Sequence, residues 1–260
     1  MRVGKCRIVV IVGVLGVIGM SGCGGGVSRE GKRAWEEGCE AYLQTNYAKA
    51  VRLYRKAEEL GYAPGALYYN LGNAYYRLGE VGRAISAYRR AQWLMPRDGD
   101  VLANLGTARR AAKEQLGMVG PPAAVQGFLF FYYHVSPDEA LWVFMVVTVV
   151  LSLGMGVQAF VKRSGLRQVL VVVGVVWVVM GSSAGVHAYR MLEPRDGVVI
   201  AERAEVRSGP SERETVIFEL HDGAEVEVLS REGDWCKIKA GAQKGWIAAR
   251  DIEMITIRRR

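Results

Sequence analysis

The chain has 260 residues, of which 50% are hydrophobic, and a formal net charge of +8. The apolar residues gather in three blocks, and the remainder has the composition of ordinary soluble protein. Much of the positive charge flanks these blocks, in residues 1–7 and 162–167. Positive charge beside apolar segments is a signal of membrane topology, so the charge does not predict nucleic-acid binding.

The sequence offers no pattern for catalysis or for a bound metal. The four cysteines and three histidines form no C-x-x-C pair and no ligand cluster. Motifs of serine hydrolases, zinc proteases and nucleotide-binding loops do not occur. Paired carboxylates such as Glu58-Glu59 are typical of solvated helix faces. We therefore expect no enzyme, no cofactor and no metal, with a site assembled from distant residues as the alternative.

Residues 1–23 have a basic start, an apolar run and small residues at the end, the pattern of a secretory signal peptide. Their last four residues, Met20-Ser21-Gly22-Cys23, resemble a bacterial lipobox, in which a signal peptidase cuts before a lipidated cysteine. Met20 stands where the lipobox usually has leucine. The resemblance predicts lipidation at Cys23, and the alternative is an uncleaved anchor with an incidental thiol.

Two further apolar segments, 139–161 and 168–189, are each long enough to cross a hydrocarbon core of about 30 Å as a helix. The short basic loop 162–167 predicts a cytoplasmic turn between them. Residues 119–138 form an interfacial linker before the first helix. This topology places the remaining domains outside the cytoplasm, on the periplasmic side of the bacterial inner membrane. The interiors carry no charge, which favours a lipid-embedded anchor over a transport path.

Residues 30–118 contain a repeat with a period of 34, since Gly38, Gly72 and Gly106 recur at that interval. The second copy resembles the tetratricopeptide (TPR) repeat most fully. Its matching residues are Tyr68, Leu71, Gly72, Tyr75, Ala84, Tyr88, Ala91 and Pro96. Each such repeat is a helix pair that buries its apolar face only by stacking on a neighbour.

In the TPR family the first helices of the repeats line a concave groove that takes a peptide or a partner helix. The resemblance assigns groove positions by offset in all three copies. They are Trp35, Cys39, Tyr42, Tyr69, Asn73, Tyr76, Ala103, Thr107 and Arg110. Asn73 and Asn104 also match repeats that clamp a C-terminal carboxylate, although Tyr69 replaces the lysine of that clamp. The alternatives are an aromatic groove for a partner segment, this clamp, or tyrosines that only pack between repeats.

Residues 197–255 change to short alternating runs separated by Gly, Asp, Ser and Pro turns, which predicts a small β barrel. The order of its motifs, from Val206-Arg-Ser-Gly-Pro to Gly245-Trp-Ile, resembles the bacterial SH3-like domain. Trp235 and Trp246 are candidate surface residues for a ligand. The competing interpretation places both tryptophans in the barrel core and its edge, as the family mainly does.

The predicted fold is therefore multidomain: an all-α TPR repeat, a two-helix transmembrane hairpin and a small all-β SH3-like barrel. This order of domains resembles the BatE-type proteins of the Bacteroides aerotolerance operon. The resemblance implies a non-enzymatic scaffold in an envelope stress complex with a MoxR-type ATPase. Its direct partners would be membrane proteins with exported domains, such as the von Willebrand factor A type. The alternative function is binding of peptidoglycan through the SH3-like domain.

Overall fold

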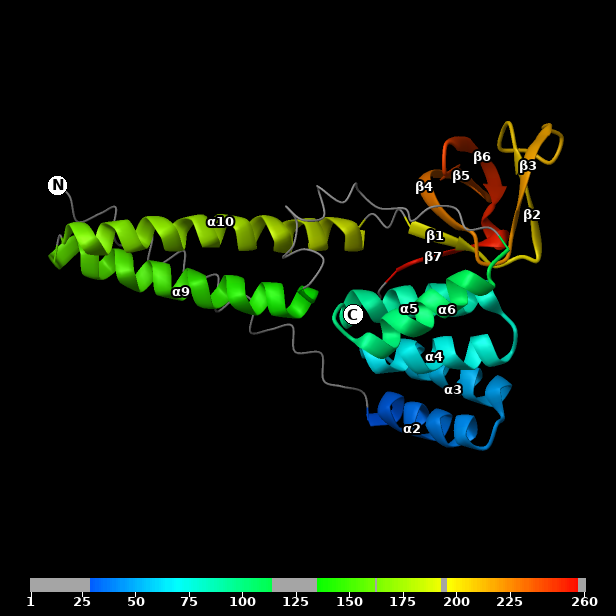
Figure 1. The fold of residues 1–260 in the computed structure, drawn as a ribbon, viewed down its shortest axis with the longest axis horizontal. Coiled ribbons are helices and arrows are strands. Elements are labelled where there is room, and N and C mark those ends of the chain that lie inside the picture. The colour runs from blue at the N-terminus through cyan, green and yellow to red at the C-terminus, as the bar shows by residue number, and fades with distance from the viewer. Residues whose placement is uncertain (1–28, 114–134, 162, 193–195, 257–260) are drawn as a thin grey trace. The chain divides into compact units, whose positions relative to one another are not determined.

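The structure is a computed structural model that describes residues 29–113, 135–161, 163–192 and 196–256. Its helices and strands fall into two compact units. One unit holds two long apolar helices. The other holds a stack of helices together with a β sheet (Figure 1). The helical repeats, the apolar helices and the all-β sheet expected from the sequence are all present.

Five consecutive helices form the helical stack, and each lies antiparallel to the next along the chain in the manner of hairpins (Figure 1). They are α2 (Arg29–Leu43), α3 (Tyr47–Glu59), α4 (Gly65–Arg77), α5 (Val81–Leu94) and α6 (Gly99–Ala111). Local caps begin two of them. The side chain of Asn46 accepts a hydrogen bond from the Lys49 amide, and Asp98 accepts from the first amides of α6. Glu80, at the start of α5, makes no such bond.

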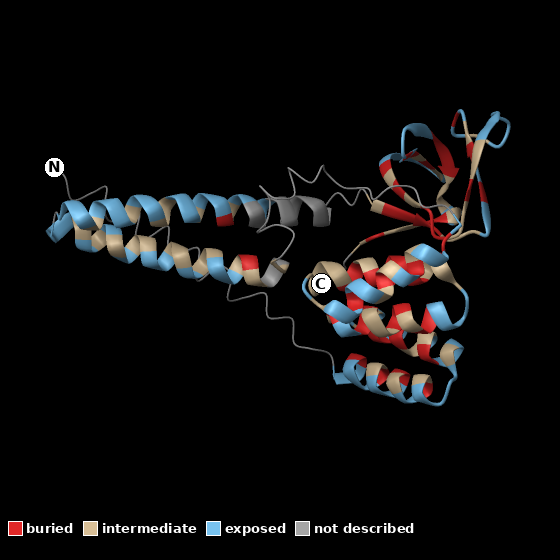
Figure 2. Cartoon of the chain, in the orientation of Figure 1, coloured by how far each residue is buried: buried red, intermediate tan, exposed pale blue. Residues whose placement is uncertain are grey.

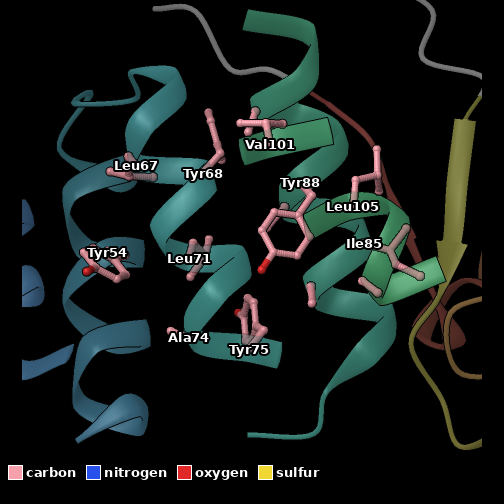
Figure 3. Packing of buried hydrophobic residues seen from close by; sticks show 14 of the residues in the cluster. Tyr54, Leu67, Tyr68, Leu71, Ala74, Tyr75, Ile85, Tyr88, Val101 and Leu105 are labelled. Carbon is pink, nitrogen blue, oxygen red and sulfur yellow. The ribbon is translucent and has the colours of Figure 1, made fainter. Parts of the chain in front are cut away.

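The helical core is built from alanines and tyrosines that face one another between the helices, shown as the buried residues in Figure 2. Tyr54 and Tyr88 occur at equivalent positions of the first two repeats and are 1% and 2% exposed. A Cβ atom at Gly72 would lie 2.6 Å from the Tyr88 ring, and one at Gly38 would lie 2.6 Å from the Tyr54 ring. The glycine therefore lets the two helices of a repeat cross closely. Figure 3 shows Tyr88 among the buried side chains of this core.

The strands pair antiparallel in one sheet with the order β3-β2-β6-β5-β4-β1-β7. They are β1 (Asp196–Val199), β2 (Arg203–Arg207), β3 (Val216–His221), β4 (Glu225–Glu232), β5 (Trp235–Ala240), β6 (Gln243–Ala248) and β7 (Ile252–Met254). Alternation along β5 buries Cys236 and Ile238 in the core of the sheet, whereas Lys239 is exposed.

The second unit consists of α9 (Pro137–Val161) and α10 (Ser164–Leu192). Both helices are long and apolar enough to cross a membrane. The indole of Trp177 donates a 2.8 Å hydrogen bond to the Thr148 hydroxyl, and the Trp177 ring stacks on Phe144. Gly181 lies against Phe144, so a small residue admits a large ring at this contact. Most other side chains of the pair are exposed or half-buried (Figure 2).

The glycines that recur every 34 residues supply a test of this packing. Gly72→Ala forces a methyl group against the buried Tyr88 ring, and we expect it to lower the free energy of unfolding by about 1–3 kcal/mol. Gly106→Ala is the matched control, because a Cβ there meets only the Arg110 guanidinium at 3.5 Å. Alanine at that helical position should leave the free energy of unfolding unchanged or raise it by about 0.5–1 kcal/mol. Urea unfolding of the full chain in detergent measures both, and equal losses would contradict the assigned crossing.

Candidate partner-binding groove

A cavity of about 390 Å³ lies on the helical stack, where residues of four helices converge. Its lining is aromatic and amide-rich. The residues are Tyr42 from α2, Tyr69, Asn73, Tyr76 and Arg77 from α4, Tyr88 from α5, and Asn104 and Thr107 from α6. The three first helices of the repeats thus meet around one open hollow, and the second helix α5 adds a tyrosine. We call this hollow the groove.

A hydrogen-bonded chain of side chains fixes the wall of the groove. The Tyr88 hydroxyl donates to the Asn73 carbonyl oxygen at 2.7 Å. The Asn104 amide donates to the same oxygen at 2.9 Å and to the Tyr69 hydroxyl at 3.2 Å. Three helices are therefore joined by polar contacts within the groove. Both remaining groups of the asparagines, the Asn73 amide nitrogen and the Asn104 carbonyl oxygen, are chemically able to bind a peptide backbone.

The groove tyrosine at the centre of this chain keeps its proton. Burial raises the pKa of Tyr88 above its ordinary value because the phenolate would lose its hydration, and the nearby Tyr69 and Tyr42 raise it further. A protonated hydroxyl is required for donation to Asn73. The network consequently holds its donor and acceptor pattern throughout the physiological pH range.

Five of the nine positions assigned by repeat offset line the groove, and four do not. Trp35 packs instead against Tyr62, with ring centroids 5.6 Å apart. Cys39 faces the repeat interior, where it receives hydrogen bonds from the Tyr54 hydroxyl and the Asn70 amide. The exposed Arg110 guanidinium donates to Thr107 at 3.0 Å beside the groove. Ala103 is exposed on α6 but is not among the lining residues either.

Three lining residues fall outside the offset pattern: Asn104, which matches the carboxylate clamp, and Arg77 and Tyr88, which no pattern assigns to the groove. Arg77 ends α4 and is exposed at the groove, where its guanidinium bonds the Tyr42 hydroxyl, which raises the Arg77 pKa. Tyr88 lies on a second helix, and the repeat pattern gives it only a packing role. The hydroxyl of Tyr88 could have indicated its place at the groove. A phenol buried between helices needs a polar partner, and the side-chain amides of the groove supply one.

The two tryptophans of the sheet differ in environment. Trp246 on β6 is 9% exposed and lies under the Lys237 ammonium, which is 5.6 Å from its ring centroid. Trp235, at the first position of β5, is half-buried. Trp246 is therefore nearly buried, while Trp235 is partly open to solvent.

The remaining candidate positions concern modification and metals. Cys23, the candidate for lipidation, lies outside the described residues. In the part of the chain that the structure describes, no group of three His, Cys, Asp or Glu side chains could hold a metal ion. The lining of the groove accordingly consists of aromatic rings, side-chain amides, one hydroxyl of threonine and one guanidinium.

The groove network can be tested with two repeat-equivalent tyrosines. Tyr88→Phe removes the 2.7 Å hydrogen bond to Asn73, and we expect a loss of about 0.5–1.5 kcal/mol in the free energy of unfolding. Tyr54→Phe is the matched control, since the Tyr54 hydroxyl donates only to the Cys39 sulfur at 3.6 Å, a weak acceptor. Chemical unfolding in detergent should show the larger loss for Tyr88→Phe, and the reverse order would contradict the network.

Comparison with known proteins identifies both soluble domains. Residues 65–98, which form α4 and α5, match the tetratricopeptide repeat family, and residues 202–253 match the bacterial SH3 domain family. Over 53 residues the chain is also 36% identical to proteins of two Staphylococcus epidermidis strains named probable cell wall amidase LytH. That similarity covers 20% of this chain and only 18% of the amidase. Tetratricopeptide repeats and bacterial SH3 domains are binding modules without catalytic activity, and together they support a binding or adaptor role.

Proposed function

We propose that this protein is a non-enzymatic adaptor of the bacterial envelope that holds a polypeptide segment of a membrane partner in the TPR groove. The observation that carries the proposal is the groove itself, an open cavity of about 390 Å³ with a preformed amide and phenol network. A rigid wall of this kind binds with little loss of side-chain freedom. Tyrosines offer both apolar area and hydrogen bonds to a peptide.

The charge of the lining selects the kind of segment. Among the described residues that line the groove, Arg77 is the single charged side chain, and no carboxylate is present. A segment that carries several lysines or arginines would find no counter-charge there. The partner segment is therefore neutral or acidic, with an acidic side chain opposite Arg77.

The two apolar helices and the basic residues between them support a membrane location. Helices α9 and α10 act as an anchor in the inner membrane, and Arg163, between the helices, and Arg167, in the first turn of α10, keep this end of the hairpin in the cytoplasm. Both binding domains then lie on the periplasmic side. A signal peptide with lipidation at Cys23 would add a second attachment to the same surface of the membrane.

The partner class follows from this location and from the domain order. A cytoplasmic protein cannot reach a periplasmic groove, so the partner is an integral membrane protein with an exported domain. The BatE-like arrangement of TPR repeats, membrane helices and SH3-like domain favours a von Willebrand factor A type partner in an aerotolerance complex. The adaptor would hold this partner and carry out no chemistry itself.

Groove substitutions test the proposal. We expect Tyr76→Ala combined with Arg77→Ala to lower capture of the partner from detergent extracts at least about tenfold, since ring contact and the counter-charge are both removed. Both side chains are exposed on α4, so the fold should persist. Quantitative mass spectrometry of material bound to the tagged full chain provides the measurement.

Leu102→Ala is the matched control for this pair. Leu102 is 42% exposed and Tyr76 is 37% exposed, but Leu102 does not line the groove. Capture should be unchanged in the control. Equal capture by the double variant and the native chain, or recovery only of proteins without an exported domain, would refute the groove assignment.

A second candidate function is binding of peptidoglycan through the SH3-like domain. It is favoured by the similarity to the proteins named cell wall amidase and by the half-buried ring of Trp235. In this alternative the adaptor would link the membrane to the cell wall.

Co-sedimentation with purified peptidoglycan tests this alternative on the full chain in detergent. We expect the chain to pellet with the polymer and Trp235→Ala to reduce the pelleted fraction several-fold. Leu229→Ala, which alters another exposed apolar side chain of the sheet, should pellet normally. No enrichment of the native chain over a polymer-free sample would reject peptidoglycan binding.

A further inference from the structure

The last described helix of the repeat array, α6, needs cover that the other described helices do not supply. Helix α6 is the first helix of the third repeat, and no second helix of that repeat occurs among the described residues. Its residues Val101, Leu105 and Ala108 are buried against the array. A terminal repeat without a partner exposes one apolar flank to water, so repeat arrays need a cap.

The SH3-like domain supplies apolar side chains to this end of the array. Val198, next to the end of β1, and Ile255, just beyond β7, belong to the core cluster of the helices and are 0% and 6% exposed. Gly223, in the turn between β3 and β4, lies so close to α5 and α6 that a Cβ there would be 2.7 Å from Ala112 and 3.2 Å from Ile85. The contact is therefore part of the helical core.

Helix α5 also receives its N-terminal cap from the SH3-like domain. The carboxylate of Asp222 accepts a hydrogen bond of 3.0 Å from the Gly82 amide, across 140 residues of sequence. Glu80 is the N-cap residue of α5, but its side chain makes no hydrogen bond to the first amides of the helix. Gly82 fits the contact closely: a Cβ there would lie 2.2 Å from the Val199 carbonyl oxygen and 2.3 Å from the Asp222 carboxylate.

Ion pairs surround this contact and reach both helices. The Arg109 guanidinium of α6 binds the Glu225 carboxylate through two hydrogen bonds of 2.5 and 2.9 Å. On α5, Arg90 binds Glu253 at 2.7 Å and Arg89 binds Asp196 at 2.9 Å. Arg90 is only 7% exposed. Bidentate and partly buried pairs define an orientation better than exposed pairs do.

From these contacts we propose that the SH3-like domain is the terminal cap of the TPR array and positions α6 as a wall of the groove. Helix α6 carries Asn104 and Thr107 into the groove, and the same helix is held from behind through Arg109 and Ala112. Asp222 and Glu225 are thus positioning residues for a groove that they do not line. The inference deepens the proposed function, on which the importance of the groove rests, but the capping itself can be measured without any partner.

Hydrogen exchange of the full chain in detergent, read by mass spectrometry, tests the cap. Gly82→Ala places a methyl group in the contact with Val199 and Asp222, and we expect exchange of the α6 amides to accelerate at least about tenfold. Amides of α2 and α3, at the other end of the array, should change much less. Asp222→Ala, which alters only the SH3-like side, should accelerate α6 in the same direction by a smaller factor.

Gly99→Ala is the matched control, because Gly99 is also close to a helix N-terminus and a Cβ there meets nothing within 4 Å. It should leave α6 protection unchanged or slightly raised. Unchanged α6 exchange in both Gly82→Ala and Asp222→Ala, or equal acceleration in α2 and α3, would overturn the cap. If the Gly82 and Asp222 variants accelerate α6 exchange as expected, but the Tyr76 and Arg77 double variant still captures the partner, only the proposed function has failed.

Discussion

The close crossing of a glycine and a tyrosine within each of the first two repeats is the contact on which the groove depends. Because Gly72 has no side chain, the Tyr88 ring lies directly against the backbone of α4. The ring then extends far enough for its hydroxyl to reach Asn73 on the groove side at 2.7 Å. One packing contact therefore brings the two helices together and also places a hydrogen-bond donor in the binding wall. A larger residue at position 72 would push α5 away from α4 and would also move the Tyr88 hydroxyl away from Asn73.

This crossing stops at the third repeat, and that difference explains the role of the sheet. Gly106 keeps the period of 34 residues, yet no tyrosine of the described residues lies against it, and among them a Cβ would meet only Arg110. The helix that carries Gly106 is instead packed from α5 and from the SH3-like turn at Gly223. Among the described residues, the contact that a second helix makes in the first two repeats is made at α6 by the SH3-like domain. Two modules that are separate in sequence consequently share one core.

Repetition and alternation in the sequence predict the helical repeats, the two apolar helices and the strands, because each depends on neighbours within one repeat or one strand. Groove residues on α4 follow from the same offsets. The repeat offsets also predict Trp35 in the groove, but it packs on Tyr62 within its own repeat, a contact that the offsets do not encode. The bond between Gly82 and Asp222 could not be predicted. It joins residues 140 positions apart, and neither residue departs from its local pattern.

The charges at the shared core contribute orientation more than affinity. Removing Arg90, Glu58 and Glu253 from water costs free energy that their mutual attraction only partly returns. The apolar contacts of Val198 and Ile255 must therefore supply most of the stabilisation, since they are nearly or fully buried. The ion pairs of Glu253, however, require that β7 meet both the first and the second repeat, because Glu253 pairs with Arg90 on α5 and lies 4.0 Å from Arg55 on α3. Hydrophobic burial thus holds the sheet to the helices, and the buried Arg90, paired with Glu58 and Glu253, fixes how β7 lies on them.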